Sequence, residues 1–245
     1  MTKRQTTPPA TGDLVPATAP PGGGALASRA PGRGKENITS EDITLPRIGI
    51  AQKTSPQLEP DKPEYIEGLK LFQLFKTATK ENYGAGPLDF VVVRMDKRAM
   101  QFDQNNNVVD FNVPLGDPRL QFTTGPDGQR VKPEAVLFYE YIVILPESRQ
   151  RAVLSLKGTA IKTARQLNNF LKMAKGDAWA QMFKLSATKG ASGSFTYGVY
   201  QIAPAGLTPD ELQAFAEETY EAYEGRVVNT DRERDEVIDT EAVPF

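Results

Sequence analysis

The sequence predicts a mainly β protein with two helices, and three observations favour this class. Several short runs of β-branched and aromatic residues in the middle of the chain are typical of strands. Turn-forming Gly, Pro, Asn and Asp residues separate these runs. One other segment has apolar residues at helical spacing, and another opens with a sequence that is typical of a helix N-terminus. Hydrophobic residues make up 39% of the 245 positions, which is enough for a sizeable core.

The expected strands follow one another with a turn signal between most neighbours. The run at 87–95 is continuously apolar, which is typical of a strand buried on both faces. The asparagines at 105–107 tolerate the left-handed geometry of a hairpin turn, and a Pro-Asp-Gly turn follows at 126–128. We expect GASG at 190–193 to form a four-residue hairpin turn. The predicted strands are 69–75, 87–95, the hairpin 101–113, 135–145, 151–156, 178–188 and 195–203.

Two segments predict helices. In residues 159–175 the apolar side chains fall on one face at helical spacing, and the basic side chains fall on the other. A second helix is expected to open at TPDEL, with Thr208 as its cap and Pro209 at the first helical position. It should end near Tyr223, before Gly225.

The order of these elements predicts the architecture. Several strands, a helix, a closing hairpin and an appended helix suit an OB-fold-like antiparallel barrel with a capping helix and an appended C-terminal helix. A β-sandwich with one decorating helix is the alternative. The residues around Pro46 should lie extended against the domain. The predicted organisation is a disordered Pro/Gly-rich segment at 1–34, a barrel-like nucleic-acid-binding domain at 35–205, the appended helix at 206–225 and a disordered acidic tail at 226–245.

The composition excludes several kinds of chemistry. The chain has no Cys and no His, which rules out disulfides, thiolate or imidazole metal ligands and a His general base. We expect no enzyme activity and no cofactor. No run approaches the roughly 20 apolar residues of a membrane helix, and the N-terminus does not read as a secretory signal. The expected location is therefore the cytoplasm, or the host cytoplasm for a phage protein, without a membrane partner.

The charge is unevenly distributed along the chain. Residues 210–245 contain twelve acidic residues and three arginines, whereas residues 1–209 carry a net charge of +7. This asymmetry predicts an anionic partner for the body and a separate role for the tail. The tail also ends on an apolar residue beside the chain's own carboxylate, which a pocket with an apolar hole and a basic rim could capture.

This tail resembles the acidic C-terminal tip of bacterial and bacteriophage single-stranded DNA-binding proteins, which ends in Pro-Phe. The resemblance implies that the tip recruits replication, recombination and repair proteins and competes with DNA for the protein's own binding groove. It covers only about the last ten positions. The residues predicted to bind partner proteins are Asp235, Glu236, Asp239, Glu241, Val243, Pro244 and Phe245.

The body supplies the groups that sequence-independent binding of a single strand needs, namely cations for phosphates and aromatic faces for bases. Tyr139 and Tyr141 share one strand face, and tyrosine tolerates one wet side. The predicted nucleic-acid-binding residues are Tyr139, Tyr141, Lys157, Lys162, Arg165, Lys172, Trp179, Lys184, Lys189 and Tyr197.

These features favour a phage-encoded, non-enzymatic single-stranded DNA-binding protein that recruits replication or recombination partners through its tail. One alternative is a phage structural or scaffolding protein without DNA binding. The other is a metal-dependent nuclease or recombination enzyme that uses Asp89, Asp96 and Asp103, near strand ends. The sequence leaves the oligomeric state open, including a homo-oligomer.

Overall fold

A computed structural model describes residues 37–39, 42–103, 107–193, 195–226 and 228–230. Residues Thr39–Phe245 belong to one compact unit, and the fold described below lies within it. The helices are α1 (Ile161–Met173) and α2 (Asp210–Tyr223), with short 3-10 turns η1 (Pro56–Leu58), η2 (Pro118–Leu120), η3 (Gly158–Ala160) and η4 (Ala178–Ala180). The strands are β1 (Thr44–Leu45), β2 (Arg47–Ile50), β3 (Leu74–Lys76), β4 (Glu81–Gly84), β5 (Leu88–Phe102), β6 (Val108–Asp110), β7 (Thr123–Thr124), β8 (Arg130–Val131), β9 (Ala135–Leu145), β10 (Gln150–Lys157), β11 (Gln181–Ser192), β12 (Phe195–Leu207) and β13 (Asn229–Thr230).

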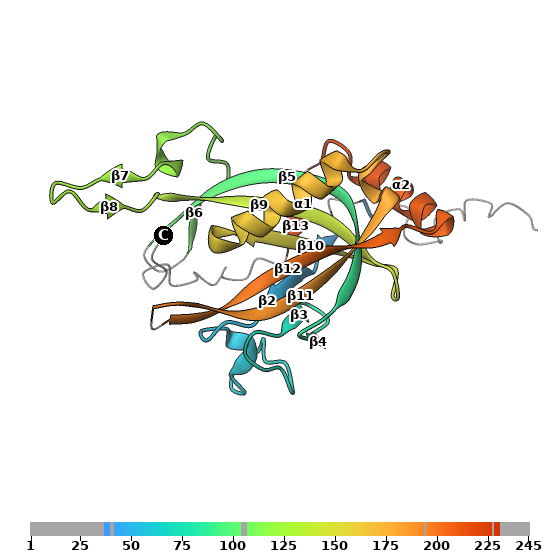
Figure 1. Ribbon diagram of the computed structural model, residues 1–245, viewed down its shortest axis with the longest axis horizontal. Helices are drawn as coiled ribbons and strands as arrows, with labels where there is room; N and C mark the ends of the chain where they lie inside the picture. Colours follow the sequence, from blue (N-terminus) through green and yellow to red (C-terminus); the bar gives the residue numbers. More distant parts are fainter. Residues whose placement is uncertain (1–36, 40–41, 104–106, 194, 227, 231–245) are drawn as a thin grey trace, which may run out of the picture. The chain divides into compact units, whose positions relative to one another are not determined.

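One nine-stranded sheet dominates the unit and curls into a half-barrel (Figure 1). Its strands run in the order β12-β11-β5-β9-β10-β2-β3-β4, and β6 adds a short hairpin to β5. The pairing of β10 with β2 is parallel, and the other pairs in this sheet are antiparallel. The prediction of a mainly β fold is confirmed. The sheet is mixed rather than purely antiparallel, because β2 comes from the N-terminal segment and adds to β10 in the same direction.

The central strands are buried on both faces, as the apolar runs predict. Along β5, Phe90 and Val92 pack on the α1 side of the sheet, and Val91 and Val93 pack on the α2 side. Strand β9 divides its side chains in the same way. Continuous β-branched runs are therefore needed here, because each alternate residue meets a separate core.

Helix α1 closes the inner side of the half-barrel. Ala164 and Leu167 are fully buried against the sheet, and the Tyr141 hydroxyl lies 3.1 Å from the Ala164 carbonyl and 2.8 Å from the Asn168 amide oxygen. Helix α2 covers the opposite face through Leu212 and Ala216, among other residues. The helix between the third and fourth main strands (β5, β9 and β10, then α1, then β11 and β12) is compatible with an OB-like fold.

Three local predictions are wrong. Of the expected strand 69–75, only the last two residues lie in β3, because Phe72 has a φ of +65° that breaks the extended run. Residues 190–192 continue β11, so Gly190–Ser192 are paired strand residues rather than a turn. Helix α2 begins at Asp210 with no side-chain cap; Thr208 is buried beside η4, where its N–H donates to the Ala180 carbonyl.

The end of the described chain returns to its beginning. Strand β13 pairs in parallel with β1, and Val228 is buried in the core under α2. Val228 and β13 lie within the segment predicted as the tail, 226–245. The predicted disordered segment at 1–34 lies outside the described residues, as does the acidic tip. None of the helices in the described part of the chain is long and apolar enough to cross a membrane.

Candidate functional site

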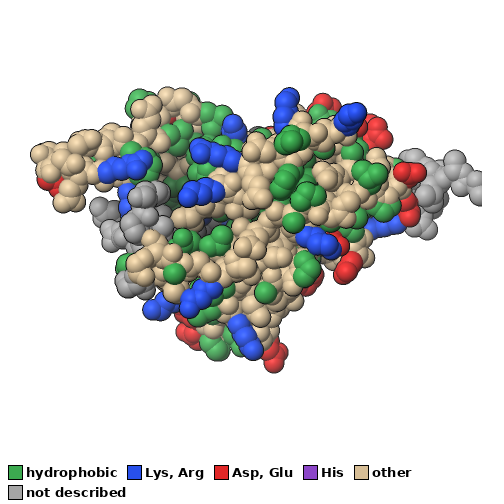
Figure 2. All heavy atoms as spheres, viewed as in Figure 1, with side chains coloured by type: hydrophobic (Ala, Val, Ile, Leu, Met, Phe, Trp, Pro, Cys, Tyr) green, Lys and Arg blue, Asp and Glu red, His purple; other side chains and the backbone are tan. Residues whose placement is uncertain are grey.

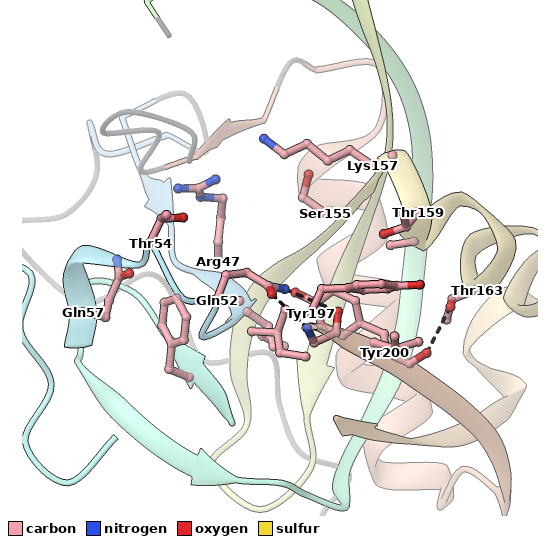
Figure 3. A pocket seen from close by; sticks show the side chains of 18 of the residues that line it. Arg47, Gln52, Thr54, Gln57, Ser155, Lys157, Thr159, Thr163, Tyr197 and Tyr200 are labelled. Atoms are coloured by element: carbon pink, nitrogen blue, oxygen red, sulfur yellow. Dashed lines mark hydrogen bonds between the residues drawn. The ribbon is translucent and has the colours of Figure 1, made fainter. Parts of the chain in front are cut away.

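A cleft of about 900 Å³ opens along the side of the half-barrel where β12 approaches β2 (Figure 3). Three parts of the chain line most of it: the segment from Arg47 to Glu64, the segment from Ser155 to Arg165 at the start of α1, and residues 197–200 of β12. Phe122 reaches the cleft from the long connection between β6 and β9. The cleft therefore joins segments that are far apart in the sequence.

Strand β12 pairs with β11 through a backbone ladder, but side-chain hydrogen bonds join it to the end of β2 and to α1. The Gln52 side chain accepts a hydrogen bond from the Gly198 N–H (2.8 Å) and donates one to the Gly198 carbonyl (3.3 Å). From α1, the Thr163 hydroxyl donates to the Tyr200 carbonyl (3.0 Å). These bonds satisfy backbone groups that an edge strand otherwise leaves unpaired. They hold the two walls of the cleft together without closing the sheet.

The cleft is electropositive. Five basic side chains line it, against the two carboxylates of Glu59 and Glu64. In Figure 3 the ends of Arg47 and Lys157 reach toward the same side of the cleft, with Ser155 close to Lys157. On the face of the molecule that Figure 2 shows, several Lys and Arg side chains lie in the middle, and most acidic side chains lie around the margin. The basic residues of the cleft are Arg47, Lys62, Lys157, Lys162 and Arg165.

Aromatic rings also line the cleft. Tyr197 and Tyr200 project from β12, and the Tyr197 ring packs over Gly190 of the neighbouring strand. A Cβ atom at Gly190 would lie 3.1 Å from the Tyr197 ring and 2.6 Å from Val199. Glycine at this position therefore lets the Tyr197 ring lie against the strand, and Tyr197 is only partly buried. Such a ring offers a flat apolar face beside cations.

Four of the ten predicted nucleic-acid-binding residues come together in this cleft: Lys157, Lys162, Arg165 and Tyr197. The first three surround the start of α1, and the fourth comes from β12. The Lys157 ammonium also lies 5.1 Å from the centre of the Phe138 ring, which orients the side chain.

The prediction that Tyr139 and Tyr141 stack on bases is wrong. Tyr141 is fully buried and its hydroxyl is bonded to α1, and this burial also raises the pKa of the Tyr141 phenol. Tyr139 is only 7% exposed, and the Lys97 ammonium lies over its ring at 5.3 Å. The alternation of the strand directs both rings into the α1-side core, which leaves no ring face for a ligand.

The remaining predicted residues do not line the cleft. Trp179 lies on η4 and packs against Tyr220 of α2, with ring centres 5.4 Å apart. Lys184 is exposed and forms an ion pair with Asp89 (2.9 Å). Lys172 and Lys189 are exposed on α1 and β11. The predicted tip residues 235–245 lie outside the described part of the chain.

Sequence reasoning missed Arg47, Gln52 and Phe122. Arg47 and Gln52 sit in or next to a short strand whose parallel partner, β10, is about a hundred residues away in the sequence. No local pattern predicts that pairing. Phe122 lies between two turn-rich segments, where a single aromatic residue carries no periodic signal.

The aspartates of the alternative metal site do not form a cluster in the described part of the chain. This part contains no group of three or more acidic side chains that could hold a metal ion. Asp89 and Asp96 are paired with Lys184 and Arg94, and Asp103 accepts hydrogen bonds from Asn107. These three aspartates are spread along the whole of the 15-residue strand β5 and just beyond it, so they do not converge.

The fold and the site together define a mainly β half-barrel protein with a basic, aromatic-lined cleft at its seam. The chain belongs to the Pam3 phage gp34-like protein family, whose family model matches residues 23–112 and 125–229. This match supports the predicted phage connection, while the resemblance to single-stranded DNA-binding proteins stays a prediction.

Other comparisons are less informative. No curated protein has a significant sequence match to the chain. One similar solved structure is yeast RPA bound to ssDNA, at 15% sequence identity, covering 56% of this chain and 87% of that chain, with a TM-score of 0.16. A TM-score this low carries no argument about the fold or the function.

Proposed function

We propose that this phage-family protein binds single-stranded DNA without sequence preference, in the cleft between β2, the start of α1 and β12. The observation that carries the proposal is the gathering of five basic side chains and Tyr197 around one open cleft. Cations follow the phosphates of a strand, and aromatic rings stack on its unpaired bases. We further propose that the fold contains a complete five-strand OB-type core, which β2 extends. We also propose that the protein has no enzyme activity.

The cleft suits an unpaired strand better than a duplex. Its aromatic residues lie inside the concave surface, where bases reach them only if they are not paired with a second strand. In the proposal the acidic tip competes with DNA for this cleft and recruits replication or recombination proteins. That part is supported by the sequence resemblance alone, since the tip lies outside the described residues.

The proposal is tested by fluorescence anisotropy of a labelled oligo-dT over a salt series, with the full chain and with a Lys157→Gln/Arg165→Gln variant. Each cation that contacts a phosphate contributes about 0.7 to the slope of log K against log salt for a single strand. The double variant should therefore bind more weakly and lose roughly 1.4 from that slope.

The matched control is Lys184→Gln, since Lys184 is exposed and lies outside the cleft. It should change the affinity for oligo-dT little. Absence of oligo-dT binding by the wild-type chain at low salt would contradict the proposal. A phage structural or scaffolding protein would then be the leading alternative.

A further inference from the structure

The connection that carries a second hairpin reaches the cleft, and no sequence pattern assigns it a role. The connection between β6 and β9, residues 111–134 and here called the arm, carries the β7–β8 hairpin, which projects from the sheet in Figure 1. Phe122, just before β7, lines the cleft and is 37% exposed. The Arg130 guanidinium from β8 lies over its ring, 3.6 Å from the ring centre.

The base of the arm is fixed to the sheet. The Arg119 guanidinium donates to Gln101 of β5 (2.6 Å), pairs with Asp110 of β6 (3.2 Å) and pairs with Asp117 (2.9 Å). Hydrogen bonds from the Arg119 guanidinium and backbone N–H hold the pKa of the Asp117 carboxyl below its ordinary value, which favours the ionised form that this network needs. Below it, Val113 and Leu120 pack on buried alanines of β5 and β9.

The tip of the arm is also ordered by its own hydrogen bonds. The Gly125 N–H donates to the Gln129 carbonyl (2.8 Å), and the Gly128 N–H donates to the Gly125 carbonyl (3.0 Å). Thr124 pairs with Arg130 across the hairpin. Phe122 and Arg130 are thus held next to each other at the cleft by both ends of the arm.

The geometry points to a stacking subsite. We propose that Phe122, backed by Arg130, binds an unpaired nucleobase of the strand in the cleft. One face of the ring is covered by the guanidinium, and the ring remains partly exposed beside the basic lining. The cation behind the ring also attracts the neighbouring phosphate. This inference rests on the proposed function and adds a base contact that faces the cleft from the arm rather than from the sheet.

The test compares two labelled probes, oligo-dT and an abasic oligonucleotide of the same length and phosphate number, with the full-length chain. Phe122→Leu keeps an apolar side chain in the hairpin but removes the ring. Stacking on an aromatic ring is worth about 1–3 kcal/mol per base, so Phe122→Leu should weaken oligo-dT binding about 5- to 150-fold. Binding of the abasic probe should not change. Phe122→Trp should bind oligo-dT at least as tightly as the wild type.

The matched control is Phe111→Leu, an exposed aromatic residue of the same arm that does not line the cleft. It should leave both affinities unchanged. Equal oligo-dT binding by wild type and Phe122→Leu would overturn the subsite while leaving the proposed function intact. An equal loss on both probes would also overturn it, since the side chain would then act through the fold. Failure of the wild type to bind oligo-dT would overturn both the subsite and the proposed function.

Discussion

At the scale of single residues, Lys76 shows how a charge is accommodated inside the sheet. Its side chain is fully buried, and its ammonium pairs with Glu81 (2.8 Å) and donates to the Gln150 side chain. Burial opposes ionisation of Glu81, but hydrogen bonds from Lys76, Tyr83 and Thr79 together hold the pKa of Glu81 below its ordinary value of 4.5. The native fold therefore favours the ionised carboxylate.

A change of Glu81→Gln should destabilise the protein by about 2 kcal/mol, because the buried Lys76 cation loses its counter-charge. The lowered pKa adds stability that is fully present above pH 4.5 and is lost as the pH falls through the lowered value. Urea unfolding at several pH values measures both effects. The wild-type free energy of unfolding should fall more steeply on acidification than that of the variant. Parallel curves would contradict this account of Glu81.

Tyr197 is an aromatic residue of the sheet that lines the cleft and is only partly buried. Tyr197→Leu should weaken oligo-dT binding by about 1–3 kcal/mol, because one stacking surface is lost. The corresponding change at Phe195, an exposed residue at the start of the same strand that does not line the cleft, should have little effect. Anisotropy titrations of both variants at one salt concentration measure the difference. Equal affinities for the two variants would show that Tyr197 does not contact the bases.

The residue scale also shows what the sequence could predict of the candidate site. Local patterns predict four residues that line the cleft: Lys162 and Arg165 belong to a basic helix stripe, Lys157 to the connection before that helix, and Tyr197 to a strand with several aromatic residues. Tyr139 and Tyr141 are two residues apart on one strand and therefore share a face. The sequence does not say which face of the sheet α1 covers, so it does not predict that both rings are buried. The answer depends on a contact of Tyr141 with Ala164, 23 residues away in the chain.

At the scale of elements, the seam between β2 and β12 determines the cleft. Gly198 allows this close approach, since a Cβ atom there would lie 2.5 Å from Ile50 Cδ1 and 2.8 Å from Ile50 Cγ1. The adjacent Gln52 amide then reaches both backbone groups of Gly198. The seam therefore depends on Gly198 of β12, which has no side chain, and on the long amide side chain of Gln52 beside β2.

Gly198→Ala should destabilise the protein by about 1–3 kcal/mol through overpacking of the seam. It should also weaken oligo-dT binding, because β12 carries Tyr197 and Tyr200. Gly116→Ala is the matched control, since a Cβ atom at Gly116 has no neighbour within 4 Å. Thermal unfolding and anisotropy of both variants measure the two effects. Unchanged stability of Gly198→Ala would show that β2 and β12 are not closely apposed.

Element types were largely predictable, and their partners were not. Residues 135–145 and the helix at 161–173 have strong local patterns, and both elements appear with nearly the predicted bounds. The parallel pairing of β2 with β10 and of β13 with β1 joins distant segments, so only the folded chain reveals it. The sequence predicts a turn at Gly190, but this residue is paired in β11, where a side chain would crowd the Tyr197 ring and Val199.

At the scale of the whole molecule, the acidic tail is predicted to compete with DNA for the cleft. Replacing Asp235, Glu236, Asp239 and Glu241 by their amides should tighten oligo-dT binding at low salt, because the competitor loses charge. The gain should shrink as salt rises, since screening weakens the competition. Phe245→Ala should leave DNA binding nearly unchanged and weaken capture of a partner protein. Unchanged oligo-dT affinity of the amide variant at low salt would contradict the competition.

The central claim is that DNA lies in the cleft rather than elsewhere on the protein. Ultraviolet crosslinking of oligo-dT to the wild-type chain, followed by mass spectrometric mapping of the crosslinked peptides, tests it most directly. The account predicts crosslinks on the peptides that contain Tyr197, Tyr200 and Phe122. Crosslinks confined to the α2 face, at Trp179 and Tyr220, would contradict it, as would the absence of any crosslink.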